Sequence, residues 1–223
     1  MHRVCFIVLQ LFITYSVYSQ YINRSYIQIY GEGLIGQHFD NNSQMIRYEL
    51  EDAVSMARNE IFEFASGMLY GYRFNLVTSN PVNGRRGYFD LEKIAVIRNN
   101  DPNMRVSQYE HSETSIRVQG TYRLQDSQKN YISGFRGAGG HMTQGTAEGS
   151  YYNDWTGRIE IYKNAIYDGI INAARLELKS RPLSITGKVL IESPPQYNLI
   201  SGKWVTNVRF HLIISNITYE NVY

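Results

Sequence analysis

The sequence predicts an α+β protein built from two similar units, with long amphipathic helices packed on antiparallel sheet. Two segments place apolar residues at spacings of three and four, which is typical of helices with one buried face. Other segments alternate apolar and polar residues, as half-buried antiparallel strands do. The order strand, helix, strand, strand occurs twice along the chain. Because each amphipathic helix needs a covering layer, we expect both helices to pack on a sheet.

The first 19 residues have the features of a secretory signal peptide. A short basic start is followed by an apolar run over residues 4–13, and Ser19 precedes Gln20 at the expected cleavage site. A buried N-terminal helix or strand is the alternative. A membrane span needs about 20 apolar residues, so this run is too short and no other run is longer. We therefore expect a periplasmic or secreted mature chain without a transmembrane span.

Composition excludes several classes of site. Cys5 is the single cysteine and lies inside the apolar run, so the mature chain would have no disulfide, cysteine nucleophile or thiolate metal ligand. The net charge is +2, with no basic cluster that resembles a nucleic-acid footprint. The 19 tyrosines suit protein-contact surfaces, although an AT-rich genome would explain them equally well.

The first unit is expected over residues 20–133. An alternating strand over residues 25–30 ends in Gly31-Glu32-Gly33. Asn41 and Gln44 have the spacing of a capping box before the helix. Strands should follow over residues 70–77, within residues 88–98 with a centre at 94–97, and over residues 116–124. The helical stripe contains Ile46, Leu50, Ala53, Val54, Ala57, Ile61, Phe64, Ala65 and Met68.

Residues 134–145 are the most glycine-dense part of the chain, and we interpret them as a flexible joint between the units. They lack the lysine of a P-loop and the third glycine of a dinucleotide fingerprint. A binding loop is the alternative interpretation. Its candidate ligand-binding residues are Arg136, Gly137, Gly139 and His141.

The second unit is expected over residues 146–223. Glu148-Gly149 matches Glu32-Gly33, and Ala174-Arg175 matches Ala57-Arg58. A helical stripe extends from Ile159 to Ala173, and Pro182 ends the helix. Strands should follow over residues 188–192 and 204–214.

No catalytic motif stands out, so we predict a protein that is not an enzyme and has no cofactor or metal site. A Gly-X-Ser-X-Gly elbow is absent, and the histidines lack metal-ligand spacing. Glu32 and Glu148 could do acid–base chemistry only if the units brought them together. On the last strand His211 is out of phase with the apolar face, so we expect it in solvent. The four histidines of the mature chain are His38, His111, His141 and His211.

The first unit resembles the envelope module of the LPP-twenty lipoproteins and of the N-terminal part of the flagellar-assembly protein FlgT. That pattern is a strand ending in Gly-X-Gly, followed by a long helix with alanines and Ala-Arg. The chain departs from the lipoproteins because it lacks a lipidation cysteine. The resemblance implies a periplasmic α+β module with a non-catalytic scaffold or assembly role. The matching residues are Ile27, Ile29, Gly31, Glu32, Gly33, Ala53, Ala57 and Arg58.

The sequence therefore favours a structural or assembly protein of the cell envelope, for which a flagellum is one setting. Its expected partners are envelope or flagellar proteins or a second copy of the chain, and not nucleic acid. The alternative is a periplasmic small-molecule binding protein with a site between the two units. An unrecognised hydrolase would need two histidines, or Glu32 and Glu148, in one cleft.

Overall fold

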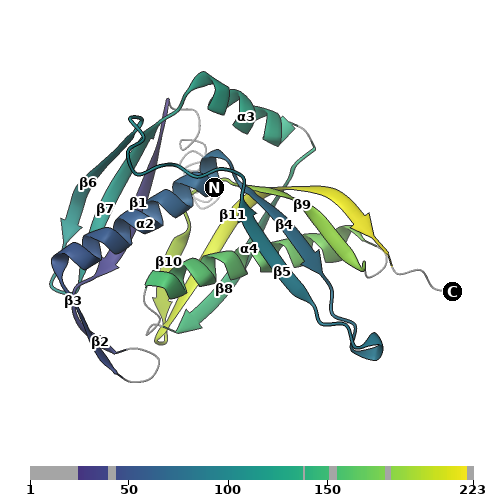
Figure 1. Ribbon diagram of the computed structural model, residues 1–223, viewed down its shortest axis with the longest axis horizontal. Coiled ribbons are helices and arrows are strands. Elements are labelled where there is room, and N and C mark those ends of the chain that lie inside the picture. The colour runs from purple at the N-terminus through teal and green to yellow at the C-terminus, as the bar shows by residue number, and fades with distance from the viewer. Residues whose placement is uncertain (1–24, 40–43, 138, 151–154, 179–181, 220–223) are drawn as a thin grey trace, which may run out of the picture.

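The computed structural model describes residues 25–39, 44–137, 139–150, 155–178 and 182–219 (Figure 1). The expected signal peptide and Asn41 lie outside these residues. Helices pack on antiparallel sheets, so the predicted α+β class is confirmed. One hydrophobic core contains buried residues from both halves of the chain.

The smaller sheet has the strand order β1-β7-β6, and the first long helix, α2, packs on β1 and β7. In Figure 1 this sheet and α2 lie on the left. Burial on β1 alternates, with Ile27, Ile29 and Gly31 on the face toward α2. The bounds are β1 Tyr26–Leu34, α2 Leu50–Leu69, β6 Met104–His111 and β7 Ser115–Arg123.

The larger sheet is built around the long strand β11. This strand pairs with β8 along one side and with β9 and β10 along the other. The second long helix, α4, packs on β8 and β11. The bounds are β8 His141–Ser150, α4 Trp155–Glu177, β9 Ser184–Ile191, β10 Gln196–Ile200 and β11 Lys203–Thr218.

The two halves share one topology. In each half, the strand before the long helix pairs with the last strand of that half: β1 with β7, and β8 with β11. The last strand pairs along its other side with the strand that precedes it in sequence: β7 with β6, and β11 with β10. β1, α2 and β7 therefore correspond to β8, α4 and β11. The order strand, helix, strand, strand is present twice, as the sequence predicted.

The equivalent residues differ from those that the sequence suggested. A Cβ atom on Gly31 would lie 1.9 Å from the carbonyl oxygen of Ala57, and one on Gly145 would lie 1.9 Å from that of Ala165. Only glycine allows so close an approach of strand and helix. Gly31 therefore corresponds to Gly145, and not to Ala147, which the match of Glu32-Gly33 with Glu148-Gly149 would imply.

Both units also protect the free edge of their first strand in the same way. The backbone N–H of Glu32 donates to Glu60, three residues after Ala57, at 3.0 Å. The backbone N–H of Thr146 donates to Asp168, three residues after Ala165, at 3.1 Å. A helix carboxylate thus satisfies an edge N–H that would otherwise be open to another strand.

The β4–β5 hairpin crosses from one unit to the other. β4 (Tyr72–Val77) and β5 (Tyr88–Lys93) follow α2 in sequence, yet β4 pairs with β9 of the larger sheet. The division at residues 133–146 therefore does not separate two independent sheets. The hairpin projects beside α4 toward the lower right of Figure 1.

The expected flexible joint is mostly regular structure. The start of the predicted joint belongs to helix α3 (Asp126–Gly137), and its end belongs to β8, which begins at His141. The second unit thus begins at β8, before the predicted residue 146. Sequence reasoning missed α3 because Gly134 and Gly137 are among its last four residues, although Gln128, Ile132 and Phe135 form a buried stripe.

Two local boundaries also differ from the predictions. Helix α2 begins at Leu50 because Glu49 and Asp52 form the capping box. The preceding Met45–Tyr48 pairs with Gly36–Phe39 as the β2–β3 hairpin, which places Ile46 in a strand. The strand expected within residues 88–98 is present at Tyr88–Lys93, before its predicted centre at residues 94–97. Polar β6 was not predicted, because its sequence has no clear alternation.

Candidate functional site

Arg158 on α4 is buried between two carboxylates from the first unit. Its Nη1 donates to Glu32 Oε2 at 3.0 Å, and its Nη2 donates to Glu60 Oε2 at 3.3 Å. Its Nε lies 2.8 Å from Glu60 Oε1. The side chains of Arg158 and Glu60 are 8% and 0% exposed. We call these three residues the Arg158 cluster, and they tie β1 and α2 to α4.

Aromatic rings cover the guanidinium of Arg158. Its Cζ atom lies 4.3 Å from the ring centre of Tyr197 and 4.9 Å from that of Trp204. The Tyr197 hydroxyl donates to the Arg158 carbonyl oxygen at 2.9 Å. β10 and β11 therefore complete the site, which is assembled from five elements.

Glu60 is the member of the Arg158 cluster that can take up a proton near neutral pH. Burial raises the pKa of Glu60 from 4.5 to about 7, although Arg158 acts in the opposite direction. Burial alone would lower the pKa of Arg158, but the charges of Glu60 and Glu32 raise it. Arg158 therefore stays positively charged.

The raised pKa of Glu60 predicts that the stability of the protein depends on pH. The pKa of Glu60 is about 7 in the folded protein against 4.5 ordinarily, so the folded state binds the proton more tightly. The resulting stabilisation of the folded state is complete below pH 4.5 and is lost as the pH rises through about 7. Urea denaturation should show the free energy of unfolding falling by up to about 3 kcal/mol across this window.

Glu60→Gln should lack this part of the decrease. An equal slope in both proteins would contradict the assignment.

A second polar cluster holds the end of α3. Arg136 Nη2 donates to Glu192 Oε2 at 2.7 Å, and His211 Nε2 lies 2.8 Å from the same oxygen. His211 is 7% exposed, so the expectation that it faces solvent is wrong. The carboxylate of Glu192 explains its burial, because it supplies a polar partner inside the protein.

The four predicted ligand-binding residues do not come together at a pocket. Arg136 is in the ion pair with Glu192, and Gly137 is the last residue of α3. Gly139 has a positive φ of 79° after the helix, and His141 is an exposed residue at the start of β8. None of the four lines the groove between α4 and the β4–β5 hairpin.

The residues considered for catalysis are also dispersed. Glu148 pairs with Lys203 on the surface, whereas Glu32 binds Arg158 in the interior. His38 contacts the Ile35 carbonyl at 2.8 Å, and His111 is exposed at the end of β6. Within the described part of the chain, no group of three His, Cys, Asp or Glu residues is placed to hold a metal ion.

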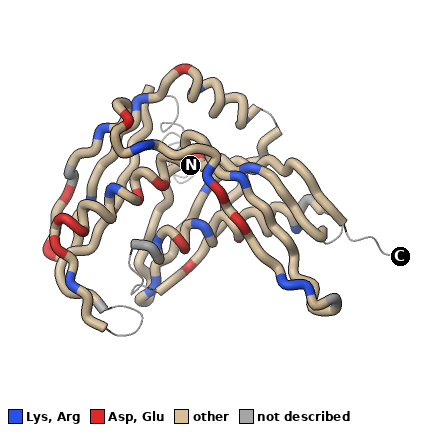
Figure 2. Tube along the Cα trace, viewed as in Figure 1, with Lys and Arg blue, Asp and Glu red and all other residues tan. Residues whose placement is uncertain are grey.

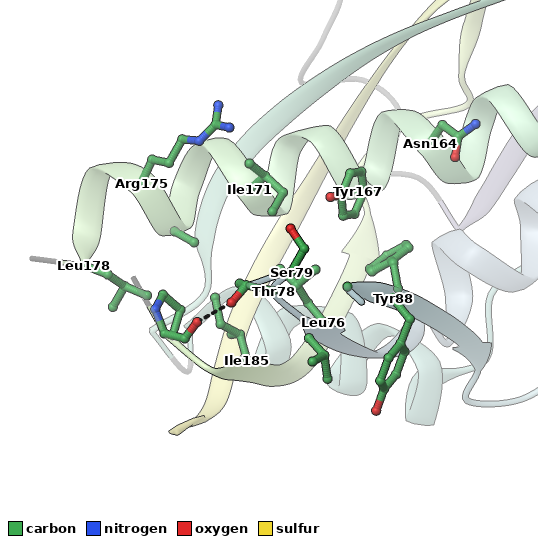
Figure 3. Close-up of a pocket in the computed structure, with 15 residues that line it drawn as sticks. Leu76, Thr78, Ser79, Tyr88, Asn164, Tyr167, Ile171, Arg175, Leu178 and Ile185 are labelled. Carbon is green, nitrogen blue, oxygen red and sulfur yellow. Dashed lines mark hydrogen bonds between the residues drawn. The ribbon is translucent and has the colours of Figure 1, made fainter. Parts of the chain in front are cut away.

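A groove of about 900 Å³ lies between α4 and the β4–β5 hairpin (Figure 3). It exists where the crossing hairpin faces the helix of the other unit. Leu76 and Ile185 are buried along its strand side, and the Phe89 and Tyr167 ring centres lie 5.0 Å apart. The α4 wall consists of Asn164, Tyr167, Ile171, Ala174, Arg175 and Leu178.

The chemistry of this groove suits binding. Its remaining lining residues are Leu76, Val77, Thr78, Ser79, Gly87, Tyr88, Phe89, Pro182 and Ile185. Among the lining side chains that the structure describes, there is neither a carboxylate nor an imidazole. The Thr78 hydroxyl is engaged, because it donates to the Pro182 carbonyl at 2.6 Å. The lining therefore offers polar and apolar surface in similar amounts, and polar groups beside apolar surface are typical of a small-molecule site.

Sequence reasoning missed Glu60 and Arg158, although a signal was present. Glu60 follows Ala57 by three residues, and Arg158 precedes Tyr162 by four, so each is in phase with its apolar stripe. A charged residue at such a position needs a partner of opposite charge. The groove had no comparable signal, because it depends on the crossing of the β4–β5 hairpin.

A protein-family model matches residues 22–219, which is most of the chain. No curated protein and no solved structure matches it. The family match concerns membership alone, so the resemblance to LPP-twenty lipoproteins and FlgT stays a prediction. Among the described helices, none is both long and apolar enough to cross a bilayer. Because the match extends over most of the chain, this protein belongs to the family that the model describes.

Proposed function

We propose that this protein is a non-catalytic binding protein that holds a small amphipathic molecule between α4 and the β4–β5 hairpin. The observation that carries the proposal is the groove of about 900 Å³ at this place. Small-molecule sites typically measure about 300–1,000 Å³ and are lined mainly by apolar and aromatic side chains. The groove also lies between the two units, as the binding hypothesis expects, although away from residues 134–145.

A neutral apolar fluorophore tests this proposal on the full mature chain. We expect N-phenylnaphthylamine to bind saturably, with one molecule per chain. Ile171→Trp should weaken binding about tenfold, because the indole occupies groove volume and costs about 1.4 kcal/mol of binding free energy. Leu176→Trp is the matched control, since Leu176 lies on the same helix, is 88% exposed and does not line the groove.

Two outcomes would refute the binding proposal. One is the absence of saturable binding to the unaltered protein. The other is equal weakening by Ile171→Trp and Leu176→Trp. Thermal unfolding of both variants should match the parent, which ensures that a loss of binding reflects the groove.

The second candidate function is a structural or assembly role in the cell envelope. Leu199 and Ile200 favour it, because both are more than half exposed in the tip of the β10–β11 hairpin. Adjacent exposed apolar side chains commonly contact another protein. Basic and acidic residues are interspersed along both halves of the chain (Figure 2), which suits a protein partner better than nucleic acid.

Fractionation of native cells separates the two candidates. Immunoblots that find the mature chain in the envelope or flagellar fraction would support the assembly role. This role also predicts that Leu199→Ser with Ile200→Ser reduces cross-linking to a partner. A freely soluble periplasmic pool that lacks cross-linked partners would leave the binding function as the better explanation.

A further inference from the structure

We infer that the ligand of the groove is a long-chain carboxylate, whose apolar chain lies against α4 and whose head group pairs with Arg175. This inference rests on the proposed function and specifies its ligand. It follows from the charge of the lining, the position of Arg175 and the shape of the groove.

Among the described residues, the lining has one formal charge, and it is positive. Arg175 is the charged side chain among the residues that line the groove, which include no Asp, Glu, Lys or His. Among the side chains that the structure describes, none forms an ion pair with Arg175. A guanidinium without a partner can form two parallel hydrogen bonds with a carboxylate. A cationic head group would meet repulsion at the same place.

Arg175 lies at the rim of the groove. Figure 3 shows its side chain rising from α4 on the side away from the strands, toward the end of the groove where Leu178 lies. Its side chain is exposed, so it can pair with a head group that remains in water. The head group would then keep its hydration while the chain enters the groove. This arrangement suits an amphipathic ligand better than a compact anion.

The groove is also elongated. Its α4 wall runs from Asn164 to Leu178, a distance of about 21 Å at 1.5 Å per helical residue. Between these ends the helix presents Tyr167, Ile171 and Ala174, which offer apolar contacts along the way. An extended hydrocarbon chain matches this length and chemistry.

Displacement of N-phenylnaphthylamine by three ligands of equal chain length tests the inference. We expect hexadecanoate to compete best, hexadecanol less well and hexadecylamine least. Arg175→Gln should weaken hexadecanoate about tenfold and leave hexadecanol within about twofold. Lys163→Gln is the matched control, because Lys163 is a cation of the same helix that does not line the groove. Added salt should reduce the advantage of the carboxylate over the alcohol.

The outcomes distinguish this inference from the proposed function. If the fluorophore binds but hexadecanoate and hexadecanol compete equally, with no effect of Arg175→Gln, the carboxylate assignment is wrong and the binding function stands. If the fluorophore binds and none of the three ligands displaces it, the long-chain class is wrong. If the fluorophore itself does not bind, both proposals fail. Vesicles of anionic phospholipid that bind as well as hexadecanoate would overturn the choice of a free carboxylate.

Discussion

Replacement of Arg158 by alanine is expected to destabilise the protein by about 3–5 kcal/mol, because it leaves buried charge without a partner. Glu60 is fully buried and Glu32 is largely buried, and both lie within hydrogen-bond distance of Arg158. The substitution also removes the guanidinium from between Tyr197 and Trp204. Urea denaturation at about pH 8 measures the loss, since Glu60 is then ionised.

A second variant isolates the electrostatic part of this effect. Arg158→Met with Glu60→Leu removes the pair together and retains apolar volume, so it should recover much of the stability lost in Arg158→Ala. Arg117→Ala is the surface control, because its ion pair with Glu110 is half exposed and should contribute no more than about 1 kcal/mol. If Arg158→Ala cost no more than Arg117→Ala, the Arg158 cluster would not hold the units together.

Substitution of Gly145 by valine is expected to prevent stable folding, with a loss above about 4 kcal/mol. Even the Cβ atom would lie 1.9 Å from the Ala165 carbonyl oxygen and 2.4 Å from the Gly169 nitrogen, and both are backbone atoms of α4. The helix would have to leave the sheet, which would expose its buried face. Circular dichroism and the yield of soluble protein would report the loss.

The repeat makes the same prediction for the first unit. Gly31→Ala should also be strongly destabilising, since its Cβ atom would meet the Ala57 carbonyl oxygen at 1.9 Å. Gly134→Ala is the matched control: it lies in α3, has open space around it and should gain about 0.5–1 kcal/mol from helix propensity. Normal stability of Gly145→Val or Gly31→Ala would disprove the close strand–helix packing.

Sequence periodicity identified the elements that bury one regular face. α4 and β11 were predicted because their apolar residues recur with the period of the element over many positions. α2 was also predicted, but its start was placed too early. The reason is that Ile46 continues the helical spacing while the backbone pairs with β2.

Only part of the Arg158 cluster could be predicted from the sequence. The positions of Glu60 and Arg158 on apolar stripes show that each needs a partner, but not which one. Their sequence separation is 98 residues, and their meeting depends on how α2 and α4 approach each other. The burial of His211 likewise depends on Glu192, the residue directly after β9.

The sequence by itself thus determined the α+β class and the repeated order of strand, helix and strands, because local periodicity reflects which face each element buries. Only the tertiary structure decided that the β4–β5 hairpin joins the sheet of the other unit. The pairing of β4 with β9 is made by backbone hydrogen bonds, which do not depend on a particular side-chain pattern. It also depends on the space beside α4. The groove between α4 and the hairpin follows from this crossing.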